Sequence, residues 1–372
     1  MATRLREILE RLESRYPSAW ALSGDRGGLE VGHPESPVKK ILVALEATPE
    51  VVAEAQKRGV QLLLTHHPLL YQPLQEIRED QPAGQVLAAV IRGGLALVSC
   101  HTNLDVAPGG LNDYLAQILG LTEVEVLAET ARDSWCKLAV MVPVGYEERL
   151  LKTLGDAGLG VIGRYSHCSF AVRGQGSYRP LKGARPFRGE VAKLFRAEEV
   201  RLEVLVPESR LTAAVALVKE AHPYEEPAYD LYPLKNPGAA LGLGRLGRWP
   251  KLKPFPKVVS LVKKLFGVKT VKVWGQLAEQ VERVAVCGGS GGDLMGQARG
   301  KGAQVYITGE VRHHQVPAGG DKDFAILEVG HFASEVVFME PWAAQLQRLF
   351  SEAGLAVQVE VALKQSSPFD YL

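Results

Sequence analysis

The sequence predicts an α/β protein in which two duplicated βα halves form one metal-binding domain, interrupted by an inserted ferredoxin-like α+β domain. Three observations predict this class. Short apolar runs alternate with segments of helical period in the first third of the chain, the last third repeats that plan, and the stretch between them follows another pattern. Strands that alternate with helices of about ten residues indicate βαβ units and a mostly parallel sheet.

The first third contains the elements of such a sheet. Apolar side chains at helical spacing predict an amphipathic helix within residues 1–17, with no unbroken apolar core of the kind a signal peptide has. Further elements follow in alternation, with strands at 41–45, 61–65 and 95–99 and helices at 49–58 and 84–92.

The last third aligns with the first. Val38–Thr65 matches Val281–Thr308 without a gap in its apolar positions, and Gly94–Asp105 matches Phe324–Glu335. Each of the latter two segments ends in His-x-x-x-Asp or His-x-x-x-Glu. We interpret the two thirds as halves of one architecture that are related by an internal duplication.

The middle stretch has two β-α-β units in tandem. Lys137–Pro143 and Arg201–Pro207 share the pattern K/R-L-x-V-x-V-P, and a helix and a strand are expected after each of them. Two such units indicate a ferredoxin-like domain. The predicted divisions are therefore a first half of the metal domain at 1–126, an inserted domain at 127–238 and a second half at 239–372.

Composition excludes several classes of protein. The 372 residues include 43 Lys and Arg and 42 Asp and Glu, which gives a net charge of +1. A protein that binds nucleic acid over its whole surface normally has a larger excess of basic residues. With 46% hydrophobic and 23% charged residues the chain is not disordered, and no apolar run approaches the ~20 residues of a membrane span. The four cysteines form no C-x-x-C pair and no disulfide framework. We expect a cytoplasmic protein without a membrane or nucleic-acid partner.

Metal-ligating side chains follow the predicted strands, at the edge of an open α/β sheet where ligands bind. They include four of the nine histidines together with two carboxylates, namely His66, His67, His101, Asp105, His331 and Glu335. Taken alone, each pair could be turn or surface residues. Together, nitrogen donors and shared carboxylates favour a dinuclear site with positions left for water and substrate. This donor set suits two divalent ions per chain, chosen from Zn, Fe, Mn and Co.

Local sequence adds detail to this site. Pro68 restricts His67 to an extended backbone, so we expect the His66 and His67 rings to diverge. A helix is expected to run from His331 through Leu349, with His331 and Glu335 on one face.

Two further motifs lie at strand ends of the second half. Glu310, His313 and His314 could support the metal ligands or donate a proton to substrate, and a polar helix start explains them equally well. The loop Gly288–Asp293, with Gly289 and Ser290, could cradle a phosphate with its N–H groups, although a flexible turn is favoured.

At these residues the sequence resembles the Nif-three-like dinuclear metal-centre proteins, which are commonly labelled GTP cyclohydrolase 1 type 2 homologues. The insert is similar to that of the longer bacterial members, which resembles PII and CutA domains, through His222–Leu234 and Gly163–Phe170. One departure is Gly24–Leu29, where members more often carry Asp-Asn before the glycine. Four ordered motifs carry the resemblance: T-H-H-P at Thr65–Pro68, H-T-N-L-D at His101–Asp105, T-G-E-x-x-H-H at Thr308–His314 and G-H-x-x-S-E at Gly330–Glu335.

The resemblance implies a site, an assembly and an activity. The implied assembly is a homohexamer of stacked trimers, and Glu335 would bridge the two ions, with His101 a neighbour in the site. By analogy the protein would be a hydrolase that opens the ring of GTP with a metal-activated water. His101 and Glu310 would transfer protons, and His313, His314, Gly289 and Ser290 would contact a small-molecule substrate such as a nucleotide. The implied metal ligands are His66, His67, Asp105, His331 and Glu335.

Two other functions remain open at this point. A non-catalytic metal-binding or regulatory protein would sense a metabolite or a partner through its PII-like insert. A phosphoesterase is a third hypothesis, because two-metal sites also suit in-line displacement at phosphorus.

Overall fold

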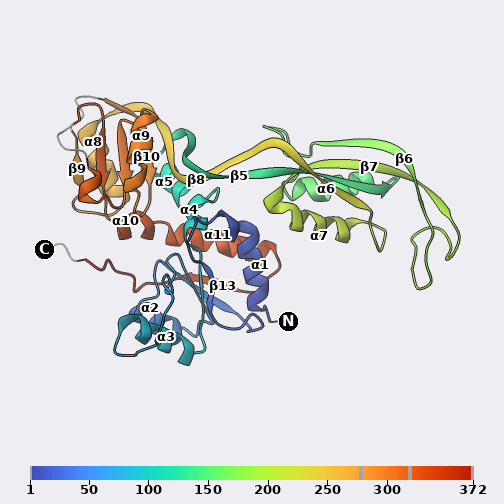
Figure 1. Ribbon diagram of the computed structural model, residues 1–372, viewed down its shortest axis with the longest axis horizontal. Helices are drawn as coiled ribbons and strands as arrows, with labels where there is room; N and C mark the ends of the chain where they lie inside the picture. The colour runs from blue at the N-terminus through green and yellow to red at the C-terminus, as the bar shows by residue number, and fades with distance from the viewer. Residues whose placement is uncertain (1, 276–279, 317–320, 370–372) are drawn as a thin grey trace. The chain divides into compact units, whose positions relative to one another are not determined.

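The computed structural model describes residues 2–275, 280–316 and 321–369 (Figure 1). The chain divides into two units. Unit 1 comprises Met1–Ala131 and Leu241–Leu372, and unit 2 comprises Arg132–Ala240. This is a mixed α/β architecture with one five-stranded and one eight-stranded sheet. The domain divisions at 126/127 and 238/239 stay a prediction.

The first sheet of unit 1 has the strand order β1-β4-β3-β2-β13. Strands β2, β3 and β4 are parallel, as is β13 beside β2, whereas β1 runs antiparallel to β4. Because the parallel strands end at one edge, the residues that follow β3 and β4 come close together. The strands are β1 (Gly28–Val31), β2 (Lys40–Ala44), β3 (Leu62–Thr65), β4 (Ala96–Ser99) and β13 (Gln358–Val361).

Helices cover both faces of this sheet (Figure 1). Alternate strand residues such as Leu42 and Leu63 pack against α2 and α3, whereas Ile41 and Leu62 face the core shared with α1 and α11. This double burial explains the continuous apolar runs that predicted the strands. The helices are α1 (Leu5–Arg15), α2 (Pro49–Lys57), α3 (Pro82–Arg92) and α11 (Met339–Glu352).

The second sheet contributes a similar parallel triplet to unit 1. Strands β10, β11 and β12 are parallel, and β8 and β9 flank them in antiparallel orientation. Side chains of this triplet join the same core as the first sheet, through α5 (Leu111–Ile118) and α8 (Phe255–Leu265). The strands are β8 (Tyr229–Pro254), β9 (Lys272–Trp274), β10 (Gln280–Cys287), β11 (Val305–Thr308) and β12 (Ala325–Glu328).

Unit 2 has the element order β-α-β-β-α-β and a core of its own. Strands β6 and β5 both pair antiparallel with β7, and side chains such as Leu138 and Val204 pack against the two helices. Strands β5 and β8 are long, and each has residues in both units. The remaining elements are β5 (Thr122–Pro143), α6 (Glu147–Asp156), β6 (Ser169–Tyr178), β7 (Phe195–Pro207) and α7 (Leu211–Ala221).

One prediction about the last third is wrong in detail. The helix expected from His331 to Leu349 is divided into α10 (His331–Val336) and α11. Pro341 explains the division, because it has no N–H for a continuing helix and its ring clashes with the preceding turn. The chain then adds β13 to the first sheet, beside β2, a pairing that was not expected.

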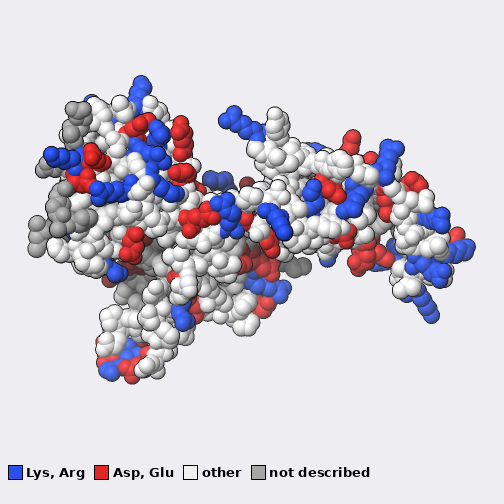
Figure 2. Space-filling model, turned by 45° about the horizontal axis from the view of Figure 1, so that its top comes forward, with Lys and Arg blue, Asp and Glu red and all other residues white. Residues whose placement is uncertain are grey.

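The surface carries side chains of both charges. Acidic and basic side chains are interspersed on the face of the molecule shown in Figure 2. Within the described residues, we find no helix with the length and apolarity needed to cross a bilayer.

Candidate metal centre

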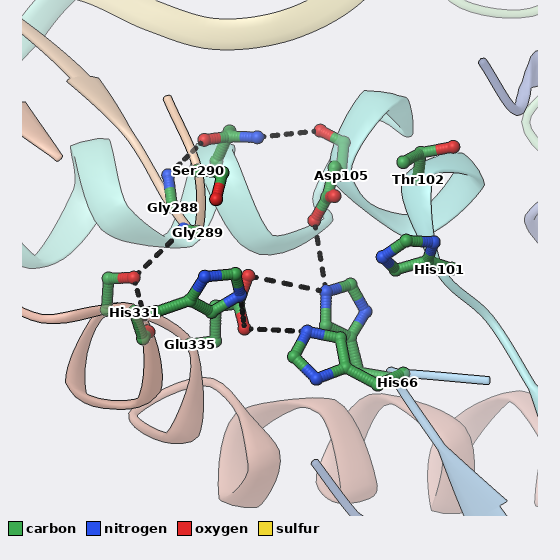
Figure 3. A network of polar contacts seen from close by, with 12 residues as sticks. His66, His101, Thr102, Asp105, Gly288, Gly289, Ser290, His331 and Glu335 are labelled. Atoms are coloured by element: carbon green, nitrogen blue, oxygen red, sulfur yellow. Dashed lines mark hydrogen bonds and ion pairs between the residues drawn. The ribbon is translucent and has the colours of Figure 1, made fainter. Parts of the chain in front are cut away.

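The structure brings all six predicted ligand candidates together at the strand ends of unit 1 (Figure 3). The first sheet supplies His66 and His67 after β3, and His101 after β4. Asp105 lies on the short helix α4 (Thr102–Val106), and α10, which follows β12, supplies the remaining two residues, His331 and Glu335.

Glu335 lies at the centre of the cluster and is only 3% exposed. Its Oε2 atom lies 3.0 Å from His67 Nε2 and 3.2 Å from His331 Nε2. Its Oε1 atom lies 3.7 Å from His66 Nε2, which is also 3.6 Å from Asp105 Oδ1. A carboxylate with imidazoles beside both oxygens has the placement that a bridging ligand requires.

Each imidazole is oriented in the same way. Its Nδ1 atom faces an oxygen outside the cluster, so a proton placed on Nδ1 leaves Nε2 free as a ligand atom, an arrangement typical of metal-binding histidines. The Nδ1–oxygen pairs are His66 with the Cys100 carbonyl at 2.9 Å, His67 with Glu46 at 3.0 Å, His331 with Glu310 at 3.3 Å and His101 with Asp25 at 2.6 Å.

The expected divergence of His66 and His67 is wrong. Their ring centroids are 5.0 Å apart with an interplanar angle of 36°, and both Nε2 atoms face Glu335. The reason is that each ring is held by its own Nδ1 partner, Cys100 just after β4 for His66 and Glu46 just after β2 for His67. The two rings nevertheless approach different oxygens of Glu335.

Several buried atoms of the cluster lack a hydrogen-bond partner and are of the kinds that bind divalent cations. Among the described residues, His66 Nε2, Asp105 Oδ1 and Glu335 Oε2 are buried and have no partner with hydrogen-bond geometry. Leaving one such group unsatisfied costs about 1–3 kcal/mol, which a bound cation would offset. Two groups of side chains could each hold an ion, namely His66, His67 and His101, and His67, His331 and Glu335.

The electrostatics of the cluster are those of carboxylates surrounded by imidazoles. Burial alone would raise the pKa of Glu335, but His331, His66 and His67 hold that pKa well below its ordinary value. Burial alone would lower the pKa of His67, but Glu335 and Glu46 raise it to about 10. Asp105 keeps a raised pKa because it is buried and close to Glu335.

We expect metal binding at neutral pH to release protons. In the metal-free protein His67 holds its proton below pH about 10, and an imidazole must be neutral to bind an ion. Metal affinity should therefore rise as the pH rises toward 10. Calorimetric titration with a divalent ion, repeated in buffers of different ionisation enthalpy, measures the number of protons released. Release of no proton at pH 7 would contradict the prediction.

The loop Gly288–Asp293 lies against Glu335 and already uses several of its N–H groups. Gly288 donates to Asn112 Oδ1 at 3.1 Å, Gly289 to Ser334 Oγ at 2.9 Å and Gly291 to the Gly289 carbonyl at 3.0 Å. These three groups are therefore engaged within the protein rather than directed at a phosphate.

Glycine is required at position 289 of this loop. Its φ is +61°, and an added Cβ would lie 2.4 Å from Glu335 Oε1. The next residue, Ser290, donates its hydroxyl to Glu310 at 3.1 Å.

Asn112 connects the two sides of the cluster and is 1% exposed. Its amide donates to the Asp105 carbonyl and accepts from Gly288, both at 3.1 Å.

We expect Asn112→Ala to lower the free energy of unfolding by about 1–3 kcal/mol, because two backbone groups lose their partner. Denaturant unfolding measures this. Gln117→Ala, on the exposed face of the same helix, is the control, and an equal loss in both would contradict the role of Asn112.

The other predicted site residues are less closely associated with the cluster. Glu310 contacts His331 but is half exposed, and His313 and His314 lie exposed on a 3₁₀ turn (His313–Gln315) instead of an α-helix start. In the described part of the chain, neither His313 nor His314 is hydrogen-bonded or ion-paired to a ligand candidate.

Sequence reasoning named one of the residues that hold the imidazoles, Glu310 beside His331, and missed the others. Glu46 follows strand β2, so the strand-end pattern that found His66 could also have found it. Asp25 lies in a loop before β1, and the Cys100 carbonyl belongs to the backbone, so no sequence pattern marks either contact.

Comparison with known proteins identifies the family of this chain. The sequence profile of the Duf34/NIF3 family (NGG1p interacting factor 3) matches residues 3–368. The chain belongs to the Duf34/NIF3 family. The resemblance inferred from the sequence motifs is therefore confirmed, and the four motifs fall within the matched region.

Other Duf34/NIF3 relatives cover nearly the whole chain. A protein of Bacillus subtilis named GTP cyclohydrolase 1 type 2 homolog is 39% identical over 366 residues, 98% of each chain. One of the same name from Mycobacterium leprae is 36% identical over 380 residues, covering 100% of this chain and 96% of its own. The crystal structure of a Bacillus cereus protein related to NIF3 has a TM-score of 0.83 and 37% identity, with 100% of both chains covered.

Proposed function

We propose that this Duf34/NIF3 protein is a dinuclear metal-dependent hydrolase, with GTP cyclohydrolase-type ring opening as the candidate reaction. The observation that carries the proposal is that three buried atoms of the cluster have no hydrogen-bond partner among the described residues, namely His66 Nε2, Asp105 Oδ1 and Glu335 Oε2. A site built only for structure would leave its polar atoms paired within the protein. The relatives' names supply the candidate reaction.

Five residues would hold the ions, with Glu335 shared between them. Bound divalent ions would lower the pKa of a water molecule toward neutrality and supply the nucleophile. The identity of the ions would be Zn, Fe, Mn or Co, because the donors are imidazole nitrogens and carboxylate oxygens. The proposed ligands are His66, His67, Asp105, His331 and Glu335.

The remaining polar residues would bind substrate and move protons. His101 is held through Nδ1 by Asp25, which leaves its Nε2 to exchange a proton with a substrate atom. Glu310 is half exposed beside His331 and could transfer a second proton. Ser290, His313 and His314 belong to the segments that follow β10 and β11, and they are the candidates for contacts with a nucleotide substrate. Gly289, the fourth candidate from the sequence, already donates its N–H to Ser334 Oγ.

The test is turnover by the purified full chain. Wild type and Glu335→Gln are analysed for metal content and incubated with GTP and a panel of other nucleotides, while the purine absorbance is followed. Turnover of GTP by wild type, lost together with metal in the variant, supports the hydrolase. Release of phosphate with the purine intact would support a phosphoesterase instead. A fully metal-loaded wild type that turns over nothing in the panel would contradict the hydrolase.

A second candidate function is non-catalytic, namely a metal-binding regulator that senses a metabolite or partner through its insert. Unit 2 favours this second function, because that unit has its own hydrophobic core and none of the six ligand candidates belongs to it.

We propose that unit 2 is a ferredoxin-like, PII/CutA-like insert and that the two parallel strand triplets of unit 1 are duplicated halves. The element order of unit 2 and the matching triplets support these assignments.

We also propose that the chain assembles as a homohexamer of stacked trimers, as the family resemblance implies. Exposed apolar side chains on the edge strand β6 support self-association, since Phe170 is 64% and Val172 49% exposed. Sedimentation of the purified chain measures the assembly, and a monomer at micromolar concentration would contradict it.

A further inference from the structure

A cavity of about 660 Å³ lies in unit 1, next to the candidate metal centre but separate from it. Its volume falls within the range of small-molecule sites, about 300–1,000 Å³. Asp25 and Cys100 line it, and these residues hold the Nδ1 atoms of His101 and His66. The cavity therefore reaches the Nδ1 side of these rings, whereas His66 directs its Nε2 toward Glu335. None of the six ligand candidates is among the described residues that line the cavity.

Apolar side chains form much of the cavity wall. Leu12 and Tyr16 line it from α1 and the turn that follows, and Val98 lines it from β4. All three are almost completely buried in the core of unit 1. A wall of this kind suits the apolar body of a ligand, whose orientation is then fixed by a few polar groups.

Glu30 supplies such a polar group and has no cation to balance it. Its Oε2 atom accepts a hydrogen bond from the Leu70 N–H at 2.7 Å, whereas Oε1 is buried and has no partner among the described residues. The hydroxyl of Ser99, a residue only 1% exposed, also has no partner there. Burial raises the pKa of Glu30, and the groups that oppose this rise are neutral donors on Leu70, Ser99 and Leu69. A buried charge is ordinarily paired with an opposite charge.

The other charged side chains of the cavity leave it acidic. Glu13 and Asp25 are carboxylates, and Arg26 is the single base among the described lining residues. In the part of the chain that the structure describes, Arg26 forms no ion pair with Glu30. The charge of the cavity therefore favours a positively charged ligand.

We propose that this cavity binds a small organic cation with an apolar body, of the class of aromatic amidines, guanidines and amines. The N–H groups of such a ligand would donate to Glu30 Oε1 and approach the Ser99 hydroxyl, and its apolar body would pack against the wall. A hydrogen bond from a cation to a carboxylate is roughly twice as strong as one between neutral groups. The binding requires no metal ion, so it is independent of the proposed hydrolase.

The experiment is a ligand-observed NMR titration of the purified full chain with benzamidine, and with benzamide as a neutral molecule of the same shape. Wild type should bind benzamidine with a Kd of about 1 mM or lower, and benzamide at least about tenfold more weakly. Glu30→Gln should bind benzamidine at least about tenfold more weakly, because the charge is lost while an acceptor for the Leu70 N–H remains. Glu10→Gln is the matched control, since Glu10 is an exposed carboxylate of α1 that does not line the cavity.

Several results would overturn the proposal. These are no binding of benzamidine at millimolar concentration, equal binding by wild type and Glu30→Gln, and benzamide bound as tightly as benzamidine. Loss of binding when a chelator is added would place benzamidine at the metal centre instead. If Glu30→Gln does not fold by circular dichroism, Ala21→Phe decides, because Ala21 lines the cavity and a larger side chain there should occupy it. Unchanged binding in that variant would overturn the proposal, whatever the result of the turnover test.

Discussion

Glu335→Gln is expected to lose both of the proposed metal ions. The substitution preserves the shape of the side chain but removes the charge that faces the imidazoles of His66, His67 and His331. Loss of an outer-shell partner alone weakens metal binding about 10–100-fold, so loss of a shared ligand should weaken it more than about 100-fold for both ions. Elemental analysis after dialysis, with calorimetric titration, measures the effect.

The same variant should also change the proton affinity of the site. Glu335 is a main reason that the pKa of His67 is raised to about 10, so in Glu335→Gln that pKa should fall. Histidine resonances in the metal-free protein report this. Glu340→Gln, at an exposed position on the neighbouring helix α11, is the control and should retain both ions. Retention of two ions by Glu335→Gln would show that this carboxylate is not a shared ligand.

Gly289→Ala is expected to weaken metal binding without changing any ligand. The new Cβ would lie 2.4 Å from Glu335 Oε1, so either the loop or the carboxylate must move. The left-handed backbone at this position costs alanine roughly 1–2 kcal/mol as well. We therefore expect the free energy of unfolding to fall by about that amount and the metal affinity to fall about tenfold.

Gly296→Ala is the matched control for this variant. Gly296 lies in helix α9 (Met295–Gly300), and an added Cβ there meets no atom within 4 Å. Alanine should therefore stabilise this helix by about 0.5–1 kcal/mol. The two glycine variants should change the free energy of unfolding in opposite directions, which denaturant unfolding measures. A Gly289→Ala protein with wild-type stability and metal content would contradict the close approach to Glu335.

Much of the mixed α/β fold could be predicted from the sequence because its strands are buried on both faces. Continuous apolar runs such as 61–65 and 95–99 mark strands β3 and β4 directly. The path of the chain after α10 was harder to predict. Strands β13 and β2 pair although they lie near opposite ends of the sequence. Neither the apolar period nor the turn residues indicate a pairing between such distant segments.

The composition of the candidate site was also accessible from the sequence, but its geometry was not. Strand-end position identified His66, His101 and Asp105, since parallel strands end at one edge. The direction of each ring depends on contacts such as Asp25 with His101, which join a loop to a distant strand end. Such contacts depend on tertiary packing, so they became apparent only in the structure.

The proposed ligands that follow β3 and lie on α10 have a consequence for the whole chain. An ion held by both His66 and Glu335 would join positions roughly 270 residues apart, and a cross-link of that span restricts the unfolded chain by roughly 5–6 kcal/mol in the entropy treatment used for disulfides. All of unit 2 lies within the closed loop, and the four cysteines are free. The ions would therefore act as reversible cross-links. A chelator would lower the protein's resistance to unfolding and to proteolysis, and it would remove any metal-dependent activity.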